Sequence, residues 1–394
     1  MSAAPTADSI WTRAFALLCL AEFLGYAQHF ALQPALPLYI THLGGSPFIV
    51  GLVIAGFGVA SVISRPIIGY WADRWSESGV MILGMITQAA TILLCFIPFN
   101  IAVLISNTLR GVGWSGMTAG GYTLLATAAP PDRRGEASGY FGGVQSTATI
   151  LFPAVALWVI DAPLGGFHAV FFLAMALVLG GAVAAGALRR AAPKRNRSTA
   201  VDASEPWWRE IMNVVDRNIF SAALLLFTLN LSLPCYSSFV VLYARELGVS
   251  HFAWYYVAVG ATSALGRPLL GRLSDKLGAR RSLIIAFSLE TFALLIMPLA
   301  SNLFGLILSG ALWFIGAAVG GTRILALAME QAPVERRGRA MASFSVAFPL
   351  SNGIGALING LIVDLAGYAW MYVAAALLCS MGLIVTRCYW AKLQ

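Results

Sequence analysis

The stretch RPIIGYWADR, residues Arg65–Arg74, has a near copy in the second half of the chain, RPLLGRLSDK, residues Arg267–Lys276. Two further pairs of segments repeat at almost the same spacing: Leu38–Phe48 with Leu242–Phe252, and Arg133–Gly135 with Arg336–Gly338. Each copy of the first motif follows a long apolar stretch. The repeat therefore predicts a duplicated membrane protein in which both copies mark the same cytoplasmic corner.

The composition independently indicates a membrane protein. Of the 394 residues, 59% are hydrophobic and only 11% are charged, and the mean hydropathy is +0.79. A membrane-spanning helix needs about 20 apolar residues. Segments of that kind can be drawn at residues 13–40, 48–71, 79–98, 102–128, 137–160, 168–188, 218–243, 251–273, 281–300, 303–328, 339–363 and 368–388.

These segments predict an all-α membrane protein with twelve transmembrane helices in two pseudo-symmetric six-helix bundles. The expected domains are an N-terminal bundle at 1–188, a charged cytoplasmic linker at 189–217 and a C-terminal bundle at 218–394. Pro34 and Pro37 in the first span and Pro234 in the seventh interrupt the helical hydrogen-bond ladder, so they are candidate bends.

The distribution of positive charge predicts the orientation. Most of the 25 Lys and Arg residues fall in loops on the side of the N-terminus, whereas Arg245 alone falls in the opposite loops. Because Lys and Arg collect on the cytoplasmic side, both termini are expected in the cytoplasm, with the chain in the cytoplasmic (inner) membrane. The net charge of +8 then reflects topology, and no nucleic-acid partner is expected.

Several function classes lack the residues that they would need. The four histidines are widely spaced, and the five cysteines show no paired spacing, so neither a metal site nor a catalytic cluster is expected. No phosphate-binding G-x-x-x-x-G-K-[ST] sequence is present to support an ATP-driven pump. We therefore expect no enzyme activity and no cofactor.

Over its whole length the chain resembles the major facilitator superfamily of transporters. The segment Gly271–Arg281 fits the signature loop between the second and third helices of a half, whereas the N-terminal copy keeps only Gly69, Asp73 and Arg74. Contacts at such a junction could hold a cytoplasmic gate shut, or the aspartates could merely cap helices. The gating candidates are Gly69, Asp73, Arg74, Gly271, Asp275, Lys276, Gly278, Arg280 and Arg281.

Charged residues inside the predicted spans are candidates for coupling, because a charge in hydrocarbon is costly. Glu22 and Arg110 both fall near mid-bilayer and could share one cavity, where a solute that separates them would switch proton binding. Arg110 and the glycines after it resemble the fourth-helix motif of proton-coupled antiporters. The alternative is a static buried ion pair. Arg65, which precedes a proline, is expected to be structural, reaching the interface or bonding a freed carbonyl.

The resemblance implies that the first, fourth, seventh and tenth helices line the substrate cavity. Their polar and aromatic residues suit a small amphipathic organic solute, and any one of them could instead serve helix packing. The candidate substrate-binding residues are Tyr26, Gln28, His29, Gln33, Asn107, Trp114, Tyr122, Asn230, Tyr236, Trp313 and Arg323.

Taken together, these residues favour a monomeric secondary transporter that works by alternating access, with protons, a small-molecule solute and the lipid bilayer as partners. An acid on the first helix and an arginine on the fourth favour proton-coupled efflux of a drug or metabolite. The fifth span lacks the Gly-Pro pair usual in exporters of the superfamily. Proton-coupled uptake and a non-transporting receptor on the same fold therefore stay open.

Overall fold

The computed structural model describes residues 10–128, 133–191, 219–332 and 337–391, and within these ranges the chain forms helices and no strand. Helices occupy each of the twelve predicted spans, which confirms the all-α prediction. Ten of the spans are long and apolar enough to cross a membrane; the helices α4 (Asn100–Ala128) and α10 (Ala253–Leu277) are not among these ten.

The helices of the N-terminal half are α1 (Arg13–His42), α2 (Pro47–Arg74), α3 (Glu77–Ile92), η1 (Leu93–Phe96), α4 (Asn100–Ala128), α5 (Arg134–Asp161) and α6 (Phe167–Ala191). Those of the C-terminal half are α8 (Phe220–Asn230), η4 (Cys235–Phe239), α9 (Val240–Glu246), α10 (Ala253–Leu277), α11 (Ala279–Ile296), η5 (Met297–Leu299), α12 (Leu303–Gln331), α13 (Arg337–Ala366) and α14 (Tyr368–Ala391).

Prolines explain where the observed spans depart from single helices. The seventh span is divided into α8, the π-helical turn η4 and α9, and the turn directly follows Pro234. Proline lacks a backbone N–H and its ring clashes with the preceding turn, so the regular ladder breaks there. Near the end of the third span, Ile97 precedes Pro98 and is extended, as expected for a residue before proline. The first span, by contrast, continues as one helix through Pro34 and Pro37.

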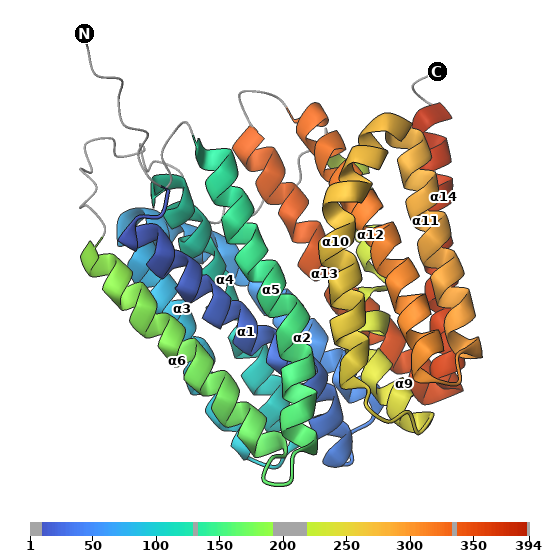
Figure 1. Ribbon diagram of the computed structural model, residues 1–394, viewed down its shortest axis with the longest axis horizontal. Helices are drawn as coiled ribbons and strands as arrows, with labels where there is room; N and C mark the ends of the chain where they lie inside the picture. The colour runs from blue at the N-terminus through green and yellow to red at the C-terminus, as the bar shows by residue number, and fades with distance from the viewer. Residues whose placement is uncertain (1–9, 129–132, 192–218, 333–336, 392–394) are drawn as a thin grey trace.

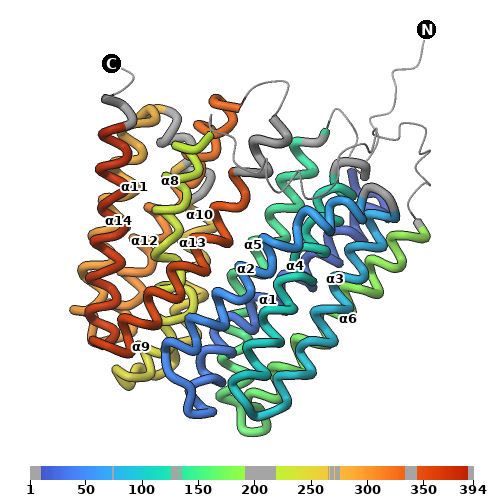
Figure 2. Tube along the Cα trace, turned by 180° about the vertical axis from the view of Figure 1, so that it is seen from behind, coloured from blue at the N-terminus to red at the C-terminus, as the bar shows by residue number. Residues whose placement is uncertain are grey.

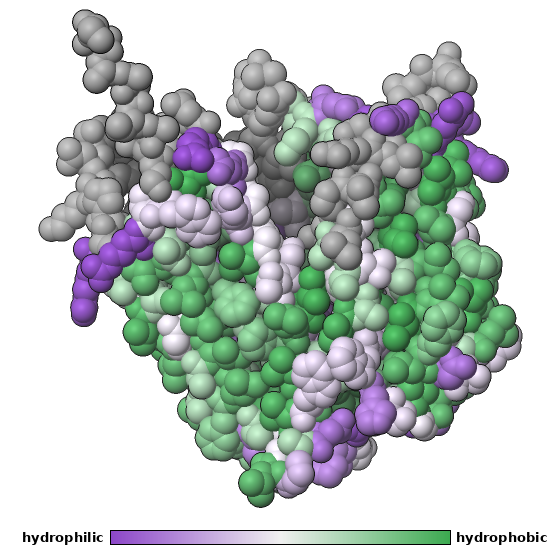
Figure 3. Space-filling model, viewed as in Figure 1, coloured by the Kyte–Doolittle hydropathy of each residue, from purple (hydrophilic) through white to green (hydrophobic). Residues whose placement is uncertain are grey.

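The helices form two groups, α1–α6 and α8–α14, which Figure 1 shows in blue to green and in yellow to red. Within the first group, glycines allow close packing: a Cβ on Gly84 would lie 2.5 Å from the carbonyl oxygen of Gly113. The predicted linker falls mostly on residues 192–218, outside the described residues. Figure 3 shows a broad hydrophobic surface around the middle of the molecule, as a lipid-facing belt requires.

The two groups meet along a seam between α2 and α13, which run antiparallel. At one end of the seam, Asp364 of α13 accepts hydrogen bonds from the Ser46 hydroxyl (2.7 Å) and the Phe48 amide (3.2 Å) at the start of α2. Further along, Gly51 lies against the backbone of Ala356. We call this end, where α1 ends and α2 begins, the closed end.

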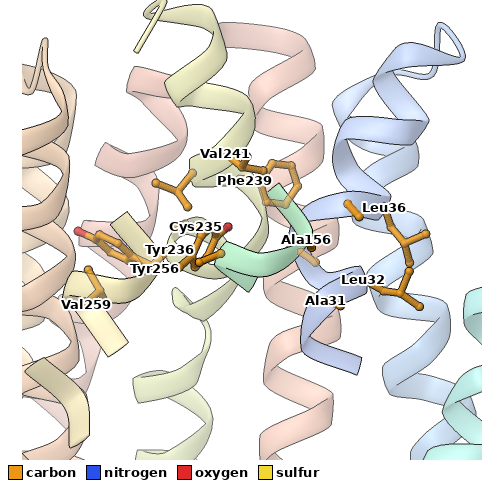
Figure 4. Packing of buried hydrophobic residues seen from close by; sticks show 14 of the residues in the cluster. Ala31, Leu32, Leu36, Ala156, Cys235, Tyr236, Phe239, Val241, Tyr256 and Val259 are labelled. Carbon is orange, nitrogen blue, oxygen red and sulfur yellow. The ribbon is translucent and has the colours of Figure 1, made fainter. Parts of the chain in front are cut away.

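Apolar packing also joins the halves toward the closed end. Leu36 of α1, Ala156 of α5 and Phe239 of η4 belong to one buried cluster, which Figure 4 shows from close by. Trp158 of α5 and Trp254 of α10 contact edge to face, with ring centroids 5.8 Å apart. Small and aromatic residues thus seal this end between the halves.

At the opposite end, where α1 begins and α14 ends, the halves separate, as Figures 1 and 2 show. Four glycines lie along the first part of α5, and a Cβ on any of them would meet no described atom within 4 Å: Gly135, Gly139, Gly142 and Gly143. We call this end the open end.

Candidate functional site

Glu22 lies inside the N-terminal half, on the part of α1 nearer the open end, and is 0% exposed. One carboxylate oxygen, Oε2, accepts a hydrogen bond of 3.1 Å from the Gln145 side-chain amide on α5. The other oxygen, Oε1, has no hydrogen-bond partner among the described residues. A Cβ added at Gly121 of α4 would overlap with this oxygen. Only glycine at 121 leaves room for the carboxyl group in this position.

Arg110 lies on α4, nearer the closed end, and is 1% exposed. Its guanidinium donates to Asn107 Oδ1 at 2.5 Å and lies 3.5 Å from His29 Nδ1. It also lies over the Phe57 ring, 5.9 Å from the centroid. Asn107 in turn donates to the carbonyl oxygen of Val53 at 2.8 Å, which ties α4 to α2.

The structure does not pair Glu22 with Arg110, so the alternative of a static buried ion pair between them is wrong. Glu22 contacts Gly121, and 11 residues of α4 separate Gly121 from Arg110, about 16 Å along a helix. The reason is helix length. α1 and α4 have 30 and 29 residues, more than the span that crosses hydrocarbon, so positions nine or ten residues from opposite ends do not coincide.

An aromatic strip extends along α1, α2 and α4 between these two charges. It consists of Tyr26, His29, Phe57 and Trp114, all half-buried. Trp114 lies between its neighbours, with ring centroids 4.8 Å from Tyr26 and 4.3 Å from His29. Such a surface can pack against the rings or chains of an amphipathic solute.

Tyr122 of α4 connects the aromatic strip with the buried carboxyl group. It is 53% exposed, and its hydroxyl lies 3.5 Å from Gln145 Oε1. Tyr26, Tyr122 and Arg65 of α2 lie close enough to interact electrostatically. The predicted residues Tyr26, His29, Trp114 and Tyr122 are therefore brought together on one wall.

Arg65 has different partners from those expected. Its Nη1 donates to the backbone carbonyl (3.3 Å) and the hydroxyl (2.9 Å) of Ser345 on α13. The bond crosses from one half to the other, rather than reaching a lipid interface or a carbonyl of its own helix. Arg65 thus contributes to the seam on the side facing the open end.

The seventh and tenth helices place their predicted residues differently. Tyr236 and Trp313 are each 1% exposed and stack on one another with centroids 5.2 Å apart. Tyr236 shares a hydrogen bond of 2.9 Å with Ser309, and Trp313 donates to Ser232 at 2.9 Å. In this conformation both aromatic side chains pack inside the C-terminal half.

Three of the four remaining substrate-binding candidates have partners within their own half. Gln28 is buried and donates to Gln88 of α3 at 2.5 Å, which is a contact inside the N-terminal half. Asn230 donates to the carbonyl of Leu226 in its own helix at 2.9 Å. Arg323 forms an ion pair with Glu330 at 3.2 Å, and Gln33 is half-buried.

The predicted gating loops are only partly described. Gly278 separates α10 from α11 with a φ of 75°, a left-handed conformation that favours glycine. A Cβ on Gly69 would meet no described atom within 4 Å. Lys276, Arg280 and Arg281 are exposed. The side chains of Asp73, Arg74 and Asp275, and the surroundings of Gly271, lie outside the described residues.

Two residues, one beside Glu22 and one at the closed end of the seam, carried no signal strong enough to single them out from the sequence. Gln145 is a polar residue in the fifth span, where many polar residues only bond their own helix. Asp364 lies near the end of the eleventh span, where an acid reads as ordinary loop polarity. Within the described residues, no three His, Cys, Asp or Glu side chains gather as metal ligands would.

Comparison with known proteins agrees with this architecture. The family model described as Major Facilitator Superfamily matches residues 18–265 and 222–392, almost the whole chain. The chain belongs to the major facilitator superfamily. It is therefore a multi-pass membrane transporter, of a family whose members are not enzymes.

Relatives within the superfamily include efflux proteins. The chain is 23% identical over 378 residues to the multi-drug resistance efflux pump PmrA of Streptococcus pneumoniae, covering 93% of each chain. It is 24% identical over 352 residues to the quinolone resistance protein NorA of Staphylococcus aureus, covering 86% of this chain and 87% of that one. Among solved structures, a bacterial homologue of the human lysosomal transporter Spinster, in an inward-facing and occupied conformation, superposes with a TM-score of 0.79 at 15% identity, covering 97% of each chain.

Proposed function

We propose that this superfamily member is a proton-coupled efflux transporter that exchanges a small amphipathic organic solute for protons by alternating access. The observation that carries the proposal is the Glu22 carboxyl group. It is 0% exposed, lies beside an aromatic wall and is held by a neutral amide rather than by a cation among the described residues. An acid kept within a membrane span normally serves a pathway, and proton exchange is the simplest one.

The proposed alternating access follows from the different states of the two ends of the molecule. Positive charge in the loops near the open end supports a cytoplasmic location for that end. The present conformation is then open to the cytoplasm, and closure of the open end with opening of the seam would expose the wall to the other side. The names of the relatives PmrA and NorA support export as the direction.

Transport in proteoliposomes with an imposed pH gradient tests both coupling and direction. We expect a quinolone and a neutral lipophilic dye to accumulate in the more acidic compartment, because protons leaving that compartment drive solute into it. A one-for-one exchange supports about tenfold accumulation per pH unit. Protein-free liposomes control for passive partition. Accumulation in the alkaline compartment would instead establish symport.

Cysteine labelling from each side of the membrane tests the orientation. In cells, cysteines introduced at Lys194 and Arg337 are expected to react only after the membrane is made permeable, because both positions are assigned to the cytoplasmic side. A cysteine at the exposed residue His251, near the closed end, is expected to react in intact cells. Opposite results for Lys194 and Arg337 would contradict the twelve-span topology.

A further inference from the structure

A chain of three polar side chains joins three helices of the N-terminal half. The Tyr122 hydroxyl on α4 donates to Gln145 Oε1 on α5 at 3.5 Å. The Gln145 amide then donates through Nε2 to Glu22 Oε2 on α1 at 3.1 Å. Gln145 is the middle member, and its amide carries one acceptor and one donor group, both in use.

The direction of these bonds depends on the state of Glu22. An ionised carboxylate can only accept hydrogen bonds, so it requires the amide to present its N–H groups. A protonated carboxyl group has a hydroxyl to donate and keeps an oxygen that accepts. Gln145 could receive that proton only through Oε1, the oxygen that now accepts from Tyr122. The bond from the amide also weakens when its acceptor loses charge. If Gln145 turns its Oε1 toward a protonated Glu22, it gives up its bond with Tyr122.

Gln145 lies where α5 leaves its partner in the other half. Five residues after Gln145, the Ile150 side chain of α5 packs against Gly260 of α10, where an added Cβ would lie 2.6 Å from Ile150 Cγ2. Two residues before Gln145, a Cβ on Gly143 would meet no described atom within 4 Å. A change in how Gln145 is held thus acts at the point where α5 separates from α10.

We propose that Gln145 is a positioning residue that transmits the protonation state of Glu22 to α5, and through α5 to closure of the open end. This inference rests on the proposed function, in which Glu22 is the proton-binding group. Gln145 need not touch the solute for this role, because it acts through the carboxyl group.

The surroundings of Glu22 contain few other groups that could take over this role. Cys19 and Tyr26 lie near it on its own helix, and Arg65 of α2 and Tyr122 of α4 interact with Tyr26. On α6, which also packs against α1, the arginines at 189 and 190 lie in the last turn, at the open end. Gln145 is the side chain that α5 places in hydrogen-bond contact with Glu22.

The test replaces Gln145 with methionine, which keeps the length of the side chain and removes the amide. With a gradient of two pH units, the wild type is expected to accumulate solute about hundredfold for a one-for-one exchange. We expect Gln145→Met to fall to about tenfold or less, since a hydrogen bond to a charged group is lost. Counterflow exchange without a gradient should stay within about twofold. Thr149→Val is the matched control, because Thr149 is half-buried one turn away and, among the described residues, its hydroxyl bonds only the carbonyl of Gln145.

Two further measurements separate this role from a merely structural one. Spin labels at the exposed residues Ser138 of α5 and Lys276 of α10 report closure of the open end. The pH dependence of their distance should disappear in Gln145→Met and persist in Thr149→Val. In a Glu22→Gln background, where residue 22 cannot titrate, Gln145→Met should not change the distance further. If Gln145→Met does not fold, Tyr122→Phe interrupts the same chain and should shift accumulation in the same direction.

The outcomes distinguish failure of this inference from failure of the proposed function. If Glu22→Gln still couples transport to the gradient, the proposed function is wrong. If Glu22→Gln uncouples transport but Gln145→Met and Tyr122→Phe leave accumulation and the pH-dependent distance unchanged, the inference about Gln145 alone is overturned. An equal change of the distance from Gln145→Met in the wild-type and Glu22→Gln backgrounds would also overturn it.

Discussion

Glu22→Gln is expected to abolish accumulation of solute against its gradient while leaving counterflow exchange largely intact. Glutamine has nearly the same size and can still bond the Gln145 amide, but it cannot bind and release a proton. The ratio of internal to external solute at a gradient of two pH units should fall from about hundredfold to about one. Proteoliposome flux with and without the gradient measures both quantities in one preparation.

Glu290 provides the matched control for this variant. It is also a membrane-buried glutamate that is 0% exposed, and its Oε2 accepts a hydrogen bond of 3.3 Å from the Cys379 thiol in the C-terminal half. It packs between α11 and α14, away from the aromatic strip. Glu290→Gln should retain gradient-driven accumulation. Retained accumulation in Glu22→Gln, or a loss confined to Glu290→Gln, would refute the assignment of Glu22.

The sequence predicted the helices well because the signals for them are local. A run of apolar residues specifies a span regardless of its neighbours, and the repeated motifs fix the pairing of the halves. The break in the seventh span was also foreseen at Pro234, where a π-helical turn follows. Pro34 and Pro37 carry the same signal, yet α1 stays one helix, since packing against neighbouring helices can compensate for lost bonds.

The site was harder to predict because it depends on rotation and displacement between helices. Glu22 and Arg110 were each recognisable as charges in hydrocarbon, but their separation depends on how far α1 and α4 extend beyond it. Gln145 and Ser345 were not recognisable, because nothing in the sequence states which face of α5 meets α1 or which face of α13 meets α2. Arg65 was seen, but its partner lies 280 residues away in the chain.

The second large effect is expected from glycines at the two ends of the interface. Gly51 of α2 lies against the carbonyl oxygen of Ala356, and a Cβ on Gly58 would lie 2.7 Å from that of Pro349. Gly51→Leu therefore cannot keep the seam closed without moving backbone. Overpacking of this kind costs about 1–3 kcal/mol, a shift of about five- to 150-fold between conformations. We expect the closed end to open.

A substitution at Gly142 of α5 is expected to have the opposite effect and to favour the present conformation. A Cβ there meets no described atom within 4 Å in the present conformation, so Gly142→Trp should leave this conformation intact. When the open end closes, however, a tryptophan would stand where α5 must approach the other half. The variant should trap the present conformation, and both Gly142→Trp and Gly51→Leu should lose most transport.

Distances between spin labels distinguish these two traps. The pair His42 and His251 reports the closed end, and the pair Ser138 and Lys276 reports the open end; all four residues are exposed. Gly51→Leu should lengthen the first distance and shorten the second, whereas Gly142→Trp should hold both at their present values under all conditions. If both variants moved the distances in the same direction, the two ends would not alternate. The seam of α2 and α13 would then be a permanent joint rather than one of two gates.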